Sequence, residues 1–177
     1  MQLNPYGAGP VTLAAELVND PPATPTELVE RCREAGLVVQ TEADHDDLEA
    51  VETFLARWQE VVDAVDHDQR AAELNDLLAA HAGHPRLVCH DDQGWHLHHR
   101  PEGVSVAQML TTLVSVGTAL HLTTRGMDRL GRCSSPPCRR VYADTSRNGR
   151  QRYCSSRCAS RQAVRRHRGR ASARHTG

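Results

Sequence analysis

Apolar residues recur at helical spacing through most of this chain. In the segment 11–19, positions 11, 13, 14, 17 and 18 are apolar and form one stripe along a helix. A helix of this kind buries its stripe against neighbouring elements, so a series of stripes predicts a helical domain with a common core. The pattern predicts helices over residues 11–19, 25–35, 44–65, 69–82 and 105–124.

The helix at 25–35 has the clearest boundaries. Thr24 supplies an N-cap, Pro25 occupies the first helical position, and Glu27 follows three residues after the cap. Gly36 stands where the helix should end. Asn19, near the end of the preceding helix, is predicted either to anchor a buried polar contact or to line a ligand cleft.

Between residues 83 and 104 the pattern changes period. The segments 86–90 (RLVCH) and 95–100 (WHLHHR) flank the turn DDQG, which predicts a β-hairpin. Alternation along a strand places His96 and His98 on one face, within reach of one metal ion. A partly packed surface hairpin is the simpler interpretation of these histidines.

Composition and charge divide the chain into two unlike parts. Aromatic residues make up only 3% of the chain, so Leu, Val and Ala must fill the core, which favours helices. Residues 1–130 hold eight Arg and twenty-one acidic residues, a net charge of −13, whereas residues 131–177 hold thirteen Arg and one acidic residue, a net charge of +12. This asymmetry predicts an acidic body carrying a basic module that binds nucleic acid. The alternative is that the two parts attract each other.

No uninterrupted apolar run approaches eighteen residues, and the first ten residues lack the pattern of a secretory signal. We therefore expect a cytoplasmic protein without a membrane span. In a reducing compartment, clustered cysteines are more often metal ligands than disulfides. Cys32 and Cys89 stand apart from the other cysteines, and we expect both to be buried as small apolar residues.

Four cysteines near the C-terminus form the most specific pattern in the sequence. Two residue pairs, C-x4-C and C-x3-C, are separated by fifteen residues, a spacing that suits one tetrahedral structural zinc ion. Two disulfides or an iron–sulfur cluster would use the same residues. With four sulfur ligands no coordination position is open, so the zinc would be structural and not catalytic. The predicted ligands are Cys133, Cys138, Cys154 and Cys158.

The segment around these cysteines predicts a small treble-clef-like finger. Residues 139–142 and 151–153 are predicted to pair as short strands around the turn Asn148-Gly149. A helix should begin after Cys154, with Ser155 or Ser156 as its N-cap.

That helix carries an arginine-rich surface. Four of its arginines fall within a narrow arc at helical spacing, and Arg166 lies elsewhere around it. Guanidinium groups bind phosphate and guanine edges, so this helix is the predicted nucleic-acid interface. DNA is the favoured partner, and RNA or an acidic protein surface is the alternative. The predicted contacts are Arg157, Arg161, Arg165, Arg166 and Arg168.

The cysteine module resembles the CGNR-type zinc finger found at the C-terminus of bacterial proteins regarded as stress-induced transcription regulators. The likeness covers residues 132–168 and rests on both cysteine pairs, the run YADTSRN at 142–148, RYCS at 152–155 and RRHR at 165–168. The resemblance implies that the four cysteines bind one zinc ion. The family signature after the last ligand is Gly-Asn-Arg, whereas Ala159-Ser160-Arg161 stands here.

The segment before the finger resembles the ABATE domain that accompanies it in this family, through LAAELVND at 13–20 and the helix that follows. We therefore expect a mainly α fold, with a helical domain at 1–125 containing one hairpin, a zinc finger at 131–168, and a disordered basic tail at 169–177. The implied function is DNA-binding transcription regulation. The helical domain would sense a small ligand or form a homodimer. No catalytic motif is present, so we do not expect an enzyme.

Overall fold

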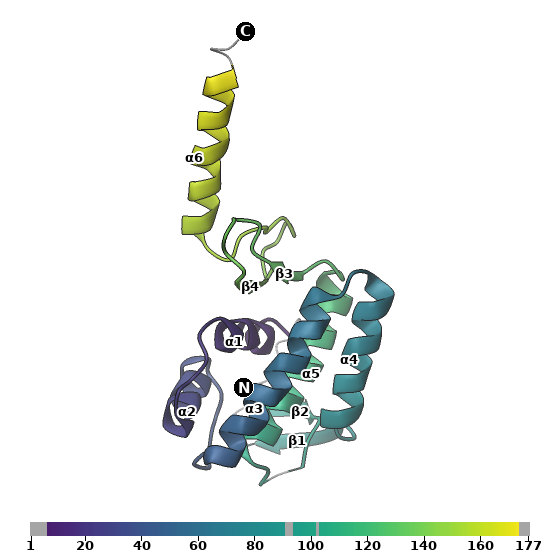
Figure 1. Ribbon diagram of the computed structural model, residues 1–177. Coiled ribbons are helices and arrows are strands. Elements are labelled where there is room, and N and C mark those ends of the chain that lie inside the picture. The colour runs from purple at the N-terminus through teal and green to yellow at the C-terminus, as the bar shows by residue number, and fades with distance from the viewer. Residues whose placement is uncertain (1–6, 91–93, 102, 174–177) are drawn as a thin grey trace.

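A helical domain and a small finger stacked on one end of it make up the described part of the chain (Figure 1). The computed structural model describes residues 7–90, 94–101 and 103–173. The mainly α fold expected from the sequence is confirmed. The helices are α1 (Ala8–Asn19), α2 (Pro25–Glu34), α3 (His45–Asp63), α4 (His67–His81), α5 (Val106–Arg125) and α6 (Ser156–Ala173). The strands are β1 (Arg86–His90), β2 (Gly94–His98), β3 (Leu130–Arg132) and β4 (Val141–Ala143).

Side-chain caps fix where the helices begin. Thr24 Oγ1 accepts the backbone N–H of Glu27 at 3.1 Å, which confirms the predicted start of α2. Asp44 and Asp47 form a capping box at the start of α3. Asp47 also accepts the backbone N–H of Ala107 at 2.9 Å, so the same carboxylate joins the starts of α3 and α5.

Helix α5 is the centre of the helical domain and packs against α1, α3 and α4. Trp58 on α3 is fully buried, and its indole N–H donates to Thr118 Oγ1 on α5 at 2.9 Å. Helix α5 is long and apolar enough to span a membrane, although it contains no uninterrupted apolar run of that length. However, 72% of its most apolar stretch is buried inside the protein. Its hydrophobicity is therefore used in the core.

The predicted hairpin forms, with Leu87 opposite Leu97 and Val88 opposite His96. Its apolar face is turned outward: Leu87, Trp95 and Leu97 are 69%, 74% and 50% exposed. Cys89 lies on the same face and is exposed, so the expectation that it is buried is wrong. Alternation places all four side chains on one face, and which face turns inward depends on contacts outside the hairpin.

The finger has a different strand pairing from the predicted one. Strand β3 pairs antiparallel with β4, and Arg132 lies opposite Val141, so the first cysteine pair sits in the loop between them. The predicted pairing of residues 139–142 with 151–153 is wrong. Residues 151–153 form no strand because their backbone groups bind elsewhere: the N–H of Gln151 donates to the Asp144 carboxylate at 2.9 Å.

The finger is joined to the helical domain by polar contacts between distant parts of the chain. The Asn19 side chain at the end of α1 donates to the carbonyl of Val141 and accepts its N–H, both at 2.7 Å. Asn19 is therefore a polar anchor and not part of a ligand cleft. The Arg132 guanidinium donates to both carboxylate oxygens of Asp63 at 2.6 Å and to Gln59 at 3.1 Å.

Apolar packing continues across the same boundary. Leu130 and Val141, from the two finger strands, are 3% and 1% exposed and belong to the core cluster of the helical domain. The finger therefore has no core of its own that is separate from the helices.

Helix α6 rises from the finger and projects away from the helical domain (Figure 1). It continues to Ala173, so residues 169–173, predicted to be a disordered tail, are helical. This stretch contains Ala and Arg, which favour helix, and one Gly is too weak a breaker to end it. Residues 174–177 lie outside the described part.

Candidate metal centre and nucleic-acid interface

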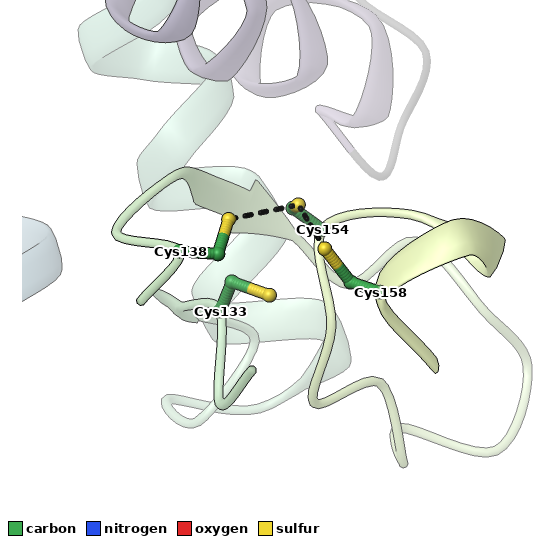
Figure 2. A group of neighbouring side chains, drawn as sticks. All are labelled: Cys133, Cys138, Cys154 and Cys158. Atoms are coloured by element: carbon green, nitrogen blue, oxygen red, sulfur yellow. Dashed lines mark hydrogen bonds between the residues drawn. The ribbon is translucent and has the colours of Figure 1, made fainter. Parts of the chain in front are cut away.

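The four predicted cysteine ligands converge on one point between the β3–β4 loop and the start of α6 (Figure 2). Their Sγ atoms all lie within 4.8 Å of one another. The Sγ atoms of Cys138 and Cys154 are 3.7 Å apart, and those of Cys154 and Cys158 are 3.9 Å apart. A tetrahedral zinc ion with bonds of ~2.3 Å separates its sulfur ligands by ~3.8 Å. The cluster therefore fits one structural zinc ion.

The two thiols nearest α6 differ in acidity. Burial and hydrogen bonds with the neighbouring thiols raise the pKa of Cys154 to about 12. A hydrogen bond with Ser155, together with those from the other thiols, lowers the pKa of Cys158 to about 7. Thiolates this close repel one another unless a cation lies between them. A bound zinc ion would supply that positive charge.

Local hydrogen bonds shape the loop that holds the first ligand pair. The N–H of Cys138 donates to the carbonyl of Ser135 at 2.7 Å, which closes a tight turn. The N–H of Cys133 donates to Arg140 O at 2.9 Å and continues the β3–β4 ladder. Ser135 is fully buried, and its hydroxyl accepts a hydrogen bond from the Gln162 amide on α6 at 3.0 Å. This contact joins the loop to α6 in addition to the metal site.

Asp144 organises the segment that leads to the second ligand pair. Its carboxylate accepts the N–H groups of Ser146 and Gln151, each at 2.9 Å, and the Ser146 hydroxyl at 2.5 Å. Arg129 lies 3.6 Å from it. Burial acts to raise the pKa of Asp144, but these hydrogen bonds and the Arg129 charge outweigh it and hold the pKa below its usual value. The ionised carboxylate of Asp144, the finger's single acidic residue, thus holds together the segment from residue 144 to 151.

The second ligand pair lies where α6 begins. The N–H of Cys158 donates to Ser155 Oγ at 3.3 Å, so Ser155 is the N-cap, one of the two residues predicted. Cys154 lies just before the cap and Cys158 in the first turn of α6, with their Sγ atoms 3.9 Å apart. Zinc bound here would therefore fix the direction of α6.

The five predicted contact arginines of α6 are exposed. Arg157, Arg161 and Arg165 are exposed, and no ion pair with an acidic side chain is found for them in the described part of the chain. Arg168 is also exposed and lies in the same arc of roughly 80° around the helix axis. Arg166 is placed differently, because its guanidinium donates to the Tyr153 hydroxyl at 2.9 Å.

The finger also carries arginines outside α6 that the helical pattern did not single out. They come from the loops of the finger, and all are exposed: Arg139, Arg140, Arg147, Arg150 and Arg152. They lie in irregular segments, so no periodic pattern marks them. The charge count of residues 131–177 was the sequence signal that included all of them.

Fold and site together define a helical-domain protein with a closed four-cysteine zinc finger. Comparison with protein families agrees with this class. A model for the CGNR zinc finger matches residues 129–171, and the ABATE model, described as "Putative stress-induced transcription regulator", matches residues 11–125. The chain therefore belongs to the ABATE family and ends in a CGNR zinc finger. None of the curated proteins compared with the chain matches it.

The replacement of Gly-Asn by Ala159-Ser160 falls in the first turns of α6. Both residues are helical, and the N–H of Ala159 donates to Ser155 O at 3.1 Å. Neither has a positive φ, the conformation that would require glycine. Alanine is the strongest helix former, so this departure from the signature suits the backbone found here.

Proposed function

We propose that this protein is a cytoplasmic, non-enzymatic transcription regulator that binds DNA through α6. The observation that carries the proposal is the exposed arginine arc of Arg157, Arg161, Arg165 and Arg168 on a helix that projects away from the acidic domain (Figure 1). A helix covered with like charges is stabilised when phosphates neutralise them. Regulator and zinc-finger families are the matches found, which supports the same conclusion.

The shape of α6 favours DNA over double-stranded RNA. A helix of 18 residues is ~27 Å long, and the major groove of B-DNA is wide enough to admit an α-helix. The major groove of A-form RNA is too deep and narrow for one. The exposed loop arginines of the finger would add further phosphate contacts.

The arrangement of the two domains bears on the protein-docking alternative. The polar contacts between finger and helical domain include those of Asn19, Asp63 and Arg132, at the base of the finger. Among the described contacts between the two domains, none involves Arg157, Arg161 or Arg165. An acidic protein partner remains the second candidate, because exposed arginines suit acidic protein surfaces as well.

Fluorescence anisotropy with zinc-loaded protein and duplex DNA tests the proposal. If each of the four arc arginines neutralises one phosphate, together they contribute about −3.6 to the slope of log K against log salt, or a loss of roughly 150-fold between 50 and 200 mM. Arg161→Ala should reduce the slope by about 0.9. The matched control is Arg33→Ala, an exposed arginine of α2, which should change nothing. Absence of binding at low salt, or equal loss in both variants, would refute DNA binding through α6.

Self-association through the helical domain is a second part of the proposal. The outer face of the hairpin exposes Leu87, Trp95 and Leu97, with no charge among them. A two-stranded hairpin gains stability when such a face is covered, and a second copy offers an identical apolar face. The patch is smaller than the ~800 Å² per partner of a standard interface, so we expect a weak dimer. Sedimentation equilibrium of wild type and Trp95→Ser checks this.

A groove on α3 and α4 is where a small ligand of the helical domain would bind. Phe54 and His81 form its floor, with their rings packed edge to face at 5.0 Å, and Asp46, Glu49 and Arg57 line its rim. Burial lowers the pKa of His81, so its ring is neutral near pH 7. The mixed apolar and acidic lining suits a small organic cation. Ligand-induced shifts of Trp58 fluorescence, one helical turn from Phe54, would reveal binding.

A further inference from the structure

The hairpin at the far end of the molecule from the finger is turned against its own hydrophobic pattern. Its apolar side chains Leu87, Trp95 and Leu97 face solvent, whereas His96 and His98 occupy the half-buried face that is turned toward the protein. Apolar residues normally occupy the inner face of a hairpin and polar residues the outer one. This inversion brings two imidazole rings together in a partly enclosed place.

The two rings meet through their metal-binding atoms. The Nε2 atoms of His96 and His98 are 3.0 Å apart, and the ring centroids are 4.8 Å apart. Nδ1 of His98 is buried, so Nε2 is the nitrogen that this ring presents. In the free protein the contact is a hydrogen bond in which one Nε2–H donates to the other ring.

The separation of the nitrogens suits two neighbouring ligands of one metal ion. With metal–nitrogen bonds of ~2.1 Å, nitrogens 3.0 Å apart subtend an angle of about 90° at the ion. That is the angle between neighbouring positions in octahedral or square-planar coordination. A tetrahedral ion would separate them by ~3.4 Å. Nickel and copper in the divalent state adopt the former geometries and bind imidazole strongly.

We propose that His96 and His98 form a second metal site, for a divalent ion of the nickel or copper type, separate from the cysteine cluster. Water or a small ligand in solution fills the remaining positions. The site joins positions i and i+2 of β2, so a bound ion stiffens this strand. It does not depend on the finger, because the hairpin and the finger lie at opposite ends of the molecule (Figure 1).

The test is titration of Ni²⁺ into tag-free, zinc-loaded, full-length protein by isothermal calorimetry. We use nickel because copper would oxidise the exposed Cys89. Wild type should bind one Ni²⁺ while retaining its zinc, as followed with a chromogenic zinc chelator. His96→Gln and His98→Gln should each weaken Ni²⁺ binding by roughly tenfold or more. His84→Gln, an exposed histidine just before β1, is the matched control and should bind as wild type does.

Three results would overturn the site. In the first, wild type binds no Ni²⁺ beyond displacement of zinc from the cysteines. In the second, His96→Gln and His98→Gln bind Ni²⁺ as wild type does. In the third, His84→Gln loses as much affinity as they do. A thermal melt of each variant without nickel verifies folding, and a nickel-induced rise in Tm confined to wild type and His84→Gln supports the site independently of heat signals.

Discussion

Removing the Asn19 side chain should loosen the finger and destabilise the whole protein. Its amide makes two hydrogen bonds of 2.7 Å to the backbone of Val141, one to the carbonyl and one from the N–H. Val141 is only 1% exposed, so Asn19→Ala leaves a buried donor and a buried acceptor without partners. Each such group costs about 1–3 kcal/mol. Because Asn19 itself is half-buried, water recovers part of this loss, and we expect about 2–4 kcal/mol in total.

Thermal unfolding of zinc-loaded protein measures this cost. For a chain of this length, 1 kcal/mol shifts Tm by ~2–4 °C, so Asn19→Ala should melt roughly 4–16 °C below wild type. Asn19→Asp keeps an acceptor for the Val141 N–H, but its carboxylate would face the Val141 carbonyl oxygen in place of an N–H donor. This variant should therefore also be less stable than wild type. The control Asn75→Ala, at an exposed position of α4, should stay within about 0.5 kcal/mol.

The same measurement tests whether the finger and the helical domain unfold together. The finger strands share the core of the helices, so helix loss and zinc release should occur in one transition, which Asn19→Ala shifts as a whole. An Asn19→Ala protein that melts like wild type would refute the anchor. A wild-type protein whose finger releases zinc well below the helical transition would refute the shared core.

Three further predictions concern the finger. Arg132→Ala should cost about 1 kcal/mol through loss of its contact with Asp63, and the loss should shrink in high salt, as chemical denaturation will show. Because the pKa of Asp144 is lowered in the folded protein, its contribution to stability is present above the ordinary carboxyl pKa of 3.8 and is lost as pH falls through the lower folded value. Wild type should therefore lose stability in acid. Asp144→Asn should be less stable than wild type near pH 7, and its stability should depend less on acid. Zinc removal by a chelator, or Cys158→Ser, should unfold the finger and lower the helical signal in far-UV circular dichroism, because metal binding supplies most of the finger's folding free energy. An unchanged spectrum after complete zinc removal would contradict this.

Features set by neighbouring residues were predictable from the sequence. The cap at Thr24 and the apolar stripe of α3 depend on residues a few positions apart, and both are present in the structure. The cysteine ligands were found from their spacing alone, and the structure brings all four sulfurs together. The Ser155 cap of α6 follows from the same local logic.

Features decided by distant partners were not predictable in this way. The finger's strand pairing was assigned to residues 151–153, but the side chain of Asp144 takes the N–H of Gln151 that such a ladder would need. Alternation showed that the hairpin has two unlike faces, but not that His96 would turn inward. The sequence also left open whether Asn19 binds a ligand, because its partner lies 122 residues away.

These contacts form a continuous connection from the helical domain to the arginine helix. Asn19 fixes β4 to the end of α1, and β4 leads directly into Asp144 and the turn that it organises. That turn delivers Cys154 to the metal centre, and Gln162 then joins α6 to the buried Ser135. The direction of α6 is therefore set by the helical domain through side chains with defined partners. A ligand or second copy that moved α1 would strain the two Asn19 hydrogen bonds or move β4 and α6 with it, so a signal bound by the helical domain has a physical route to the proposed DNA-contacting surface.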